Sequence, residues 1–223
     1  MSTGSNTNSS GVYEHHPAHH FRDAEHEVDS SKFGLWLFLC TEIVMFGGLF
    51  VGYAIFNSMY PEIFEVGSTF LDWKYGSVNT IVLLISSFTV VMAIHSAQVN
   101  NKKMVLVNLY LTLICAGIFM VIKYIEYSHK IHEGLLPGKF FSYAGPEVAG
   151  VESLPIYFSF YFCMTGLHGS HVLAGMGLIG WLIYRAHKGH FGPKYYTPIE
   201  CVGLFWHLVD LIWIYLFPLL YLV

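Results

Sequence analysis

An imidazole and a carboxyl group lie one helical turn apart inside the apolar segment "FWHLVDLIWIYLF", residues 205–217. They belong to His207 and Asp210, and Trp206 and Trp213 flank them. A titratable side chain at the centre of a bilayer costs roughly 2.5–3.5 kcal/mol on insertion scales. At i, i+3 spacing the imidazole N–H can reach the carboxylate, which offsets part of that cost. We therefore expect these two residues to form a polar clamp that holds helices together.

A lone acid interrupts another apolar segment, "LWLFLCTEIVMFGGLFVG", at Glu42. Gly48 and Gly52 share one stripe of this helix, and Glu42 lies about 80° from that stripe at about 100° per residue. Small residues at this spacing let another helix approach closely, so Glu42 is expected to border a protein contact. No Lys or Arg follows Lys32 within the segment. Two interpretations stay open, a hydrogen-bonded packing acid and a carboxyl that exchanges protons or sets an interface.

Two further segments carry titratable pairs at the same spacing. "MVIKYIEYSHKIHEG" places Glu126 three residues after Lys123, which predicts an ion pair near the water boundary. "MTGLHGSHVLAGMGLIGW" places His168 and His171 one turn apart on one helix face. Such a pair can share one metal ion, but a bis-histidine haem needs ligands from two helices.

Histidine is frequent, with 13 residues, and it suggests an alternative function. Together with His95, the histidines of the apolar segments fall in three segments, which leaves an independent b-type cytochrome or a metal transporter open. The "HHPAHH" stretch at residues 15–20 is expected to be solvated, with weak metal binding as its alternative. The four cysteines lack a C-x-x-C pair and are expected to be packing residues.

Composition indicates an integral membrane protein. Hydrophobic residues make up 54% of the 223 residues and charged residues only 12%, about half the usual share of a soluble domain. The formal net charge of −4 provides no basic surface for nucleic acid. Continuous apolar stretches predict helices and not the alternating strands of a membrane barrel. The fold expected is an all-α bundle of five transmembrane helices, over residues 33–56, 76–98, 103–127, 154–184 and 199–222.

The domain organisation follows from these spans. Residues 1–32 are rich in Ser, Asn and His and are expected to form a flexible cytoplasmic tail, with the transmembrane domain at 33–223. Seven Lys and Arg residues lie in the tail and in the second and fourth connections, whereas three lie in the first and third. The positive-inside rule then places the N-terminus in the cytoplasm and the C-terminus outside.

Four motifs in one order along residues 32–223 resemble subunit III of the haem–copper oxidases. "KFGLWLFLCTEIVMFGGLF" is similar to that family's "FWxFFxSEVMFF" helix, and "KYIEYSH" to its "FEY" segment. "TGLHGSHVLAG" resembles "TGFHGLHV", and "GLFWHLVDLIWIYLFPLLYLV" resembles the ending "WHFVDVVW". The positions that correspond to the family's polar motif residues are Glu42, Glu126, Tyr127, His168, His171, His207 and Asp210.

The resemblance implies a subunit of an oxidoreductase complex that has no catalytic centre itself. In this family haem and copper reside in subunit I and a dinuclear copper in subunit II, so no cofactor or metal is expected in this chain. Subunit I is the expected main partner, followed by subunit II, other respiratory-complex subunits and membrane lipid. The implied role is to stabilise subunit I and to support its proton uptake, with Glu42 facing subunit I.

The resemblance also sets the expected type and location. Mitochondrial-type members have seven helices, and the first two have no counterpart here. A five-helix bacterial type in the inner membrane is therefore expected. In the seven-helix members a lipid-binding cleft lies between the two-helix and five-helix parts, so it cannot be carried over intact. A bound phospholipid is still compatible with the five-helix chain. The expected complex is a bacterial terminal oxidase, with cytochrome c favoured over quinol as electron donor. An accessory subunit of a nitric oxide reductase is the alternative.

Overall fold

The computed structural model describes residues 23–137, 140–141, 143, 154–193 and 195–222. Within these ranges the regular elements are helices, and the β pairing consists of isolated bridges and no named strand. The helices described are α1 (Ala24–Met59), α2 (Pro61–Thr69), α3 (Trp73–Gln98), α4 (Lys102–His132), α5 (Leu154–His187) and α6 (Thr197–Tyr221). All of these except α2 are long and apolar enough to cross a membrane, which confirms the prediction of an all-α bundle with five membrane-spanning helices.

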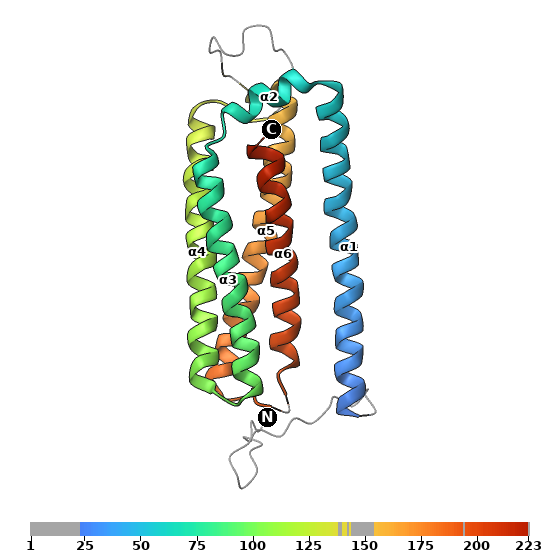
Figure 1. The fold of residues 1–223 in the computed structure, drawn as a ribbon, viewed down its shortest axis with the longest axis vertical. Helices are drawn as coiled ribbons and strands as arrows, with labels where there is room; N and C mark the ends of the chain where they lie inside the picture. Colours follow the sequence, from blue (N-terminus) through green and yellow to red (C-terminus); the bar gives the residue numbers. More distant parts are fainter. Residues whose placement is uncertain (1–22, 138–139, 142, 144–153, 194, 223) are drawn as a thin grey trace.

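The five long helices run side by side, and their packing is uneven. Helices α3, α4, α5 and α6 form a four-helix bundle, and α1 stands at its edge, where it contacts α5 and α6 (Figure 1). Helix α6 lies between α3 and α1, with α5 behind it in this view. The short helix α2 covers the end of the bundle at which α6 finishes, and it packs on α5.

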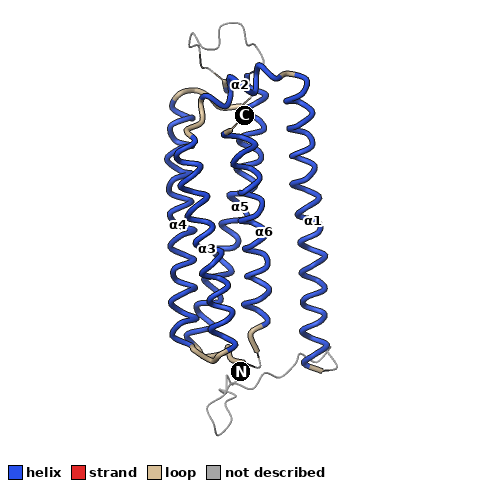
Figure 2. Tube along the Cα trace, viewed as in Figure 1, coloured by secondary structure: helices blue, strands red, loops and turns tan. Residues whose placement is uncertain are grey.

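Local sequence signals explain where several helices begin. The side chain of Asp72 accepts a hydrogen bond from the Lys74 N–H at the start of α3, and Asn101 accepts one from the Met104 N–H at the start of α4. The turn from α3 to α4 is tight, as the tube in Figure 2 shows, and Asn100 adopts a φ of 58° there. Asn is one of the few residues that tolerates this left-handed conformation.

The start of α1 and the presence of α2 depart furthest from the expected spans. Helix α1 begins at Ala24, nine residues before the expected start at 33, so part of the expected tail is helical. Glu25 and Glu27 in its first turn interact favourably with the positive end of the helix dipole, which lets the helix continue beyond the apolar segment. The other residues of the expected tail, 1–22, lie outside the described ranges. Helix α2 was not expected, because its nine residues are too short for a span; they bury Ile63 and Phe64.

Helix α1 meets the bundle along one narrow stripe. Its buried residues within the described part are Leu39, Phe46 and Tyr53, spaced seven apart. This heptad spacing places every second turn on the same line along the helix. The close approach expected at the glycine pair is only half present, since a Cβ on Gly52 would meet the Phe160 ring at 3.6 Å while one on Gly48 would meet nothing within 4 Å.

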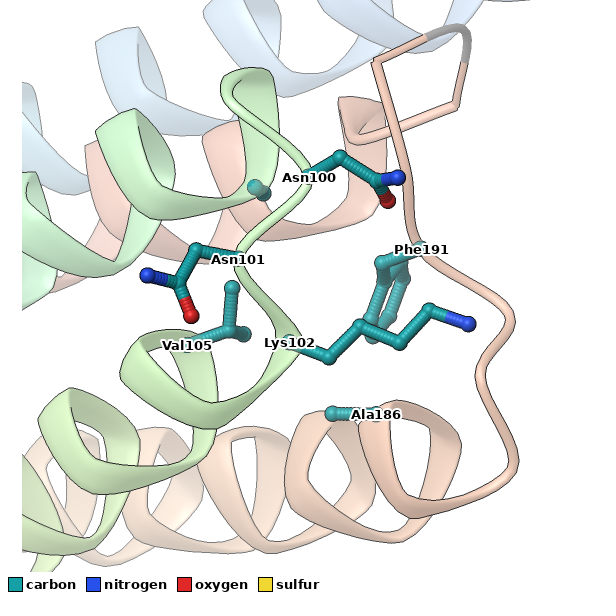
Figure 3. Close-up of a pocket in the computed structure, with 7 residues that line it drawn as sticks. Asn100, Asn101, Lys102, Val105, Ala186 and Phe191 are labelled. Atoms are coloured by element: carbon teal, nitrogen blue, oxygen red, sulfur yellow. The ribbon is translucent and has the colours of Figure 1, made fainter. Parts of the chain in front are cut away.

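A small pocket lies at the end of the bundle where the α3–α4 turn meets the segment after α5 (Figure 3). Asn100, Asn101 and Lys102 line it from the turn, and Phe191 and Ala186 line it from the other side. The pocket is separate from the polar groups of the candidate site, which lie further along the helices.

Candidate functional site

A polar contact between two membrane-spanning helices joins α1 to α5. Glu42 Oε2 lies 2.8 Å from His171 Nε2, and both side chains are largely buried, with exposed fractions of 13% and 16%. The other ring nitrogen, Nδ1, lies 2.8 Å from the Leu167 carbonyl oxygen. A carbonyl oxygen can only accept, so Nδ1 carries a hydrogen. The structure thus brings together two residues that the sequence analysis named separately.

This geometry fixes the number of protons that the pair holds. With a hydrogen on Nδ1, a neutral imidazole offers Nε2 only as an acceptor, so Glu42 must donate. The alternative is an imidazolium that donates to a carboxylate. In both forms a single proton lies between Oε2 of Glu42 and Nε2 of His171. Phe46 meets the His171 ring edge-on, with centroids 5.4 Å apart, and so limits its rotation.

The Glu42 carboxyl group turns inward to α5, and the expectation that this part of α1 borders subunit I stays a prediction. The cause of the inward turn is the His171 imidazole, whose hydrogen bond a hydrocarbon environment could not replace. The neighbouring residues Ile43 and Val44 are exposed at 55% and 74% and form the outer surface of α1 instead.

The Lys123–Glu126 ion pair is confirmed, with 2.9 Å between Nζ and Oε2, but it is buried. Each residue is only 7% exposed, so the pair near the end of α4 is enclosed by the neighbouring helices. Tyr161 and Tyr221 both donate hydrogen bonds to Glu126 Oε1, from α5 and α6 respectively. Lys123 also donates to the Tyr221 hydroxyl and lies 4.7 Å from the centre of the Trp213 ring. Burial is tolerated because these partners satisfy both charges.

His168 and His171 do not act together, although they are one turn apart. His168 is fully buried, and its ring packs against Phe119 and Trp213. Neither ring nitrogen has a hydrogen-bond partner in the described part of the chain. His171 instead turns to α1. Within the described ranges, no three His, Cys, Asp or Glu side chains gather as a metal would need.

The expected clamp between His207 and Asp210 is wrong. His207 Nδ1 lies 2.6 Å from Ser87 Oγ on α3, and both carboxyl oxygens of Asp210 lack a hydrogen-bond partner among the described residues. Asp210 is 3% exposed, and the Ser87 hydroxyl is its polar neighbour. The imidazole therefore bonds to the adjacent helix α3 and not along α6.

Three partners of these titratable groups were not predicted from the sequence: Ser87, Tyr161 and Tyr221. Each is a hydroxyl side chain within a span, and each completes a titratable group that the sequence analysis did name. The depth of each hydroxyl along its span was a usable signal. Antiparallel helices of known length bring the ends of α4, α5 and α6 to the same depth, where Tyr161 and Tyr221 can reach Glu126. A tyrosine in an apolar span can equally be a packing residue, so its type alone does not predict a hydrogen bond to a titratable group.

These features define a multi-pass helical membrane protein whose buried polar groups join one span to another. The family model described as cytochrome c oxidase subunit III matches residues 18–223. Subunit 3 of the cytochrome bo(3) ubiquinol oxidase of Pseudomonas putida is 30% identical over 85% of this chain and 84% of its own length. Quinol oxidase subunit 3 of Bacillus subtilis is 29% identical, over 85% of each chain.

A relative named for a different electron donor is equally similar. Cytochrome c oxidase subunit 3 of Thermostichus vulcanus is 31% identical over 90% of this chain and 91% of its own. The chain belongs to the cytochrome c oxidase subunit III family. It is therefore subunit III of a haem–copper oxidase, a respiratory electron-transport complex, and it associates with other oxidase subunits in a membrane. The expected preference for cytochrome c as donor is not supported, because the names of these relatives include both donors.

Proposed function

We propose that the chain is the non-catalytic subunit III of a bacterial terminal oxidase in the inner membrane, where it stabilises subunit I and supports its proton uptake. The observation that carries this proposal is the Glu42–His171 pair, which holds one proton between two helices within the membrane-spanning region. An acid beside an imidazole can exchange that proton without any change in the number of hydrogen bonds. The same contact fastens α1, whose buried stripe is otherwise narrow.

In this proposal the redox chemistry belongs to the partner subunits. Haem and copper reside in subunits I and II, and this chain contributes no ligand to them. Subunit I is the main contact and subunit II a further one. Because the chain belongs to the subunit III family, the proposal sets aside the alternative of an independent b-type cytochrome or metal transporter. An accessory subunit of a nitric oxide reductase differs in its companions, so identifying the subunits that co-purify distinguishes it.

The proposed orientation has the N-terminus in the cytoplasm and the C-terminus in the periplasm. Lys102 and Lys103 at the start of α4 and Arg185 and Lys188 at the end of α5 lie at the same end of the bundle as the start of α1. A cluster of basic residues at one end favours the cytoplasmic side. A reporter fused after α6 should be periplasmic, and one in the α3–α4 turn should be cytoplasmic.

Quinol is the proposed donor of the complex, in place of cytochrome c. The support is that two of the three relatives named above are quinol oxidases. The donor site would lie in partner subunits, so this proposal rests on the relatives' names and not on residues of this chain. Oxygen consumption by the purified complex with a quinol, compared with reduced cytochrome c, tests it.

The central test is Glu42→Gln in the intact complex. The Gln amide can donate to His171 Nε2, so the contact and the assembly should persist, but no proton can be exchanged. Sustained turnover and proton uptake should therefore slow, while Thr41→Ala, on the exposed side of the same helix turn, should leave both unchanged.

Two outcomes contradict this proposal. Loss of the subunit from the complex in Glu42→Gln would assign the pair a charged, structural role. Unchanged assembly together with unchanged turnover would leave Glu42 as a packing residue.

A further inference from the structure

His207 presents an unsatisfied polar atom at the surface of the bundle, near the middle of a membrane span. It is the eleventh residue of the 25-residue helix α6, about 15 Å from the start of the helix at 1.5 Å per residue. Its Nδ1 bonds to Ser87, but Nε2 has no hydrogen bond within the described part of the chain. Nε2 is also absent from the buried unpaired atoms, and the residue is only partly buried, so Nε2 is reachable from outside.

The residues around this atom form a strip on α6 and α3. Apolar side chains lie above and below the polar centre at helical spacing on both helices. The strip comprises Leu84, Ser87 and Val91 on α3 and Leu204, His207, Leu211 and Ile214 on α6. Leu84, Val91, Leu211 and Ile214 are each 44–51% exposed. Helix α1 borders the strip on its other side, since α6 lies between α1 and α3 (Figure 1).

Hydrocarbon cannot satisfy such a centre. Lipid tails offer no hydrogen-bond donor or acceptor, and an unpaired polar group at this depth costs several kcal/mol. A polar headgroup stays at the membrane surface, about half a bilayer away. A protein helix that crosses the membrane can place a hydrogen-bonding side chain at this level.

We propose that the strip docks a transmembrane helix of a neighbouring oxidase subunit, which hydrogen-bonds His207 Nε2 at mid-membrane. The proposal rests on the proposed function, because it needs a companion subunit. It assigns that contact to α3 and α6 and not to Glu42, whose carboxyl group faces His171 inside the chain. The apolar flanks provide helix packing, and the imidazole fixes the level at which the two helices meet.

The direct test is photo-crosslinking in the intact complex. A photoreactive amino acid at Leu211, one turn from His207, should crosslink this chain to another oxidase subunit. The matched position is Val121 on α4, which is 58% exposed on a face outside the strip. Crosslinks from Leu211 only to lipid, to a quinone or to α1 of the same chain would overturn the proposal. If the chain does not co-purify with oxidase subunits at all, the proposed function itself fails, which is a distinguishable result.

A second measurement separates the partner's hydrogen bond from the one within the chain. His207→Leu removes Nε2, and retention of the subunit during detergent titration should fall about threefold, the typical size of a hydrogen bond between membrane helices. Thr112→Val removes an internal hydrogen bond between α3 and α4, to Thr89, away from the strip, and should retain the subunit at the wild-type level. Equal losses in both variants, or no loss in His207→Leu, would show that Nε2 has no partner in the complex.

Discussion

Helix α1 and the four-helix bundle it borders are held by different physical means. In the most apolar window of α1 only 11% of the residues are buried within the chain, against 50% in α6. The bundle is tight enough that a Cβ on Gly175 would lie 2.6 Å from the Trp206 ring. Helix α1 is held by a single stripe of buried side chains. It also makes three polar contacts with α5 and α6, through Glu42, Tyr53 and Lys32. Variants of the bundle should therefore destabilise the whole chain, whereas variants of α1 should release one helix.

The largest effect is expected from Glu126→Ala in the bundle. The change leaves the Lys123 ammonium buried without its counter-charge, which typically costs about 3–5 kcal/mol. The free energy of unfolding in a denaturing-detergent titration should fall by that amount. Tyr124→Ala on the same helix is the control, because its side chain is 75% exposed. Equal stability of the two variants would mean that the ion pair is not buried.

A smaller loss is expected where two helices touch. Gly175→Ala forces the fully buried Trp206 ring to move, and overpacking of this kind costs about 1–3 kcal/mol. Gly177→Ala on the same helix meets nothing within 4 Å and should change stability by less than about 0.5 kcal/mol. An unchanged stability of Gly175→Ala would show that α5 and α6 can separate around Trp206 at little cost.

Tyr53→Phe sharpens the comparison, because it acts on α1 alone. The Tyr53 hydroxyl donates to the Leu219 carbonyl of α6 at 2.6 Å, and such a bond contributes about 0.5–1.5 kcal/mol. Backbone amides of α1 should exchange hydrogen faster, while those of α4 keep their protection. Tyr60→Phe, at the exposed end of the same helix, serves as the control. Faster exchange throughout the bundle would contradict a separate attachment of α1.

The smallest effect is expected from Lys32→Gln. Lys32 Nζ lies 3.0 Å from Glu200 Oε2, but the two side chains are 44% and 23% exposed. Exposed ion pairs contribute about 0.2–1 kcal/mol and are screened by salt. The variant should loosen the start of α1 at low ionic strength and match the wild type at high ionic strength. A difference that persists in high salt would indicate a contribution other than charge.

The sequence predicted what depends on local spacing and length. Five spans follow from apolar runs long enough to cross hydrocarbon, and the Lys123–Glu126 contact follows from its i, i+3 spacing. Partners distant in the chain were not predictable in this way. Glu42 and His171 are 129 residues apart, and only the packing of α1 against α5 brings them together.

The error at His207 and Asp210 has the same origin. Their spacing along α6 permits a contact, but a serine 120 residues from His207 on α3 takes the imidazole instead. Local spacing shows which groups can meet and not which neighbour competes for them. The burial of Glu126 was missed for a related reason, since it depends on Tyr221, 95 residues further along the chain.

The central position of α6 has a consequence for how the chain is made. Ribosomes deliver the other four spans to the membrane before α6, yet α6 packs against α1, α3 and α5. Until it arrives, Glu126 lacks the Tyr221 hydroxyl and Tyr53 lacks the Leu219 carbonyl. A nascent chain must therefore hold these polar groups incompletely satisfied until α6 enters the membrane. The docking of α6 then completes the contacts of α1, α3 and α5 together.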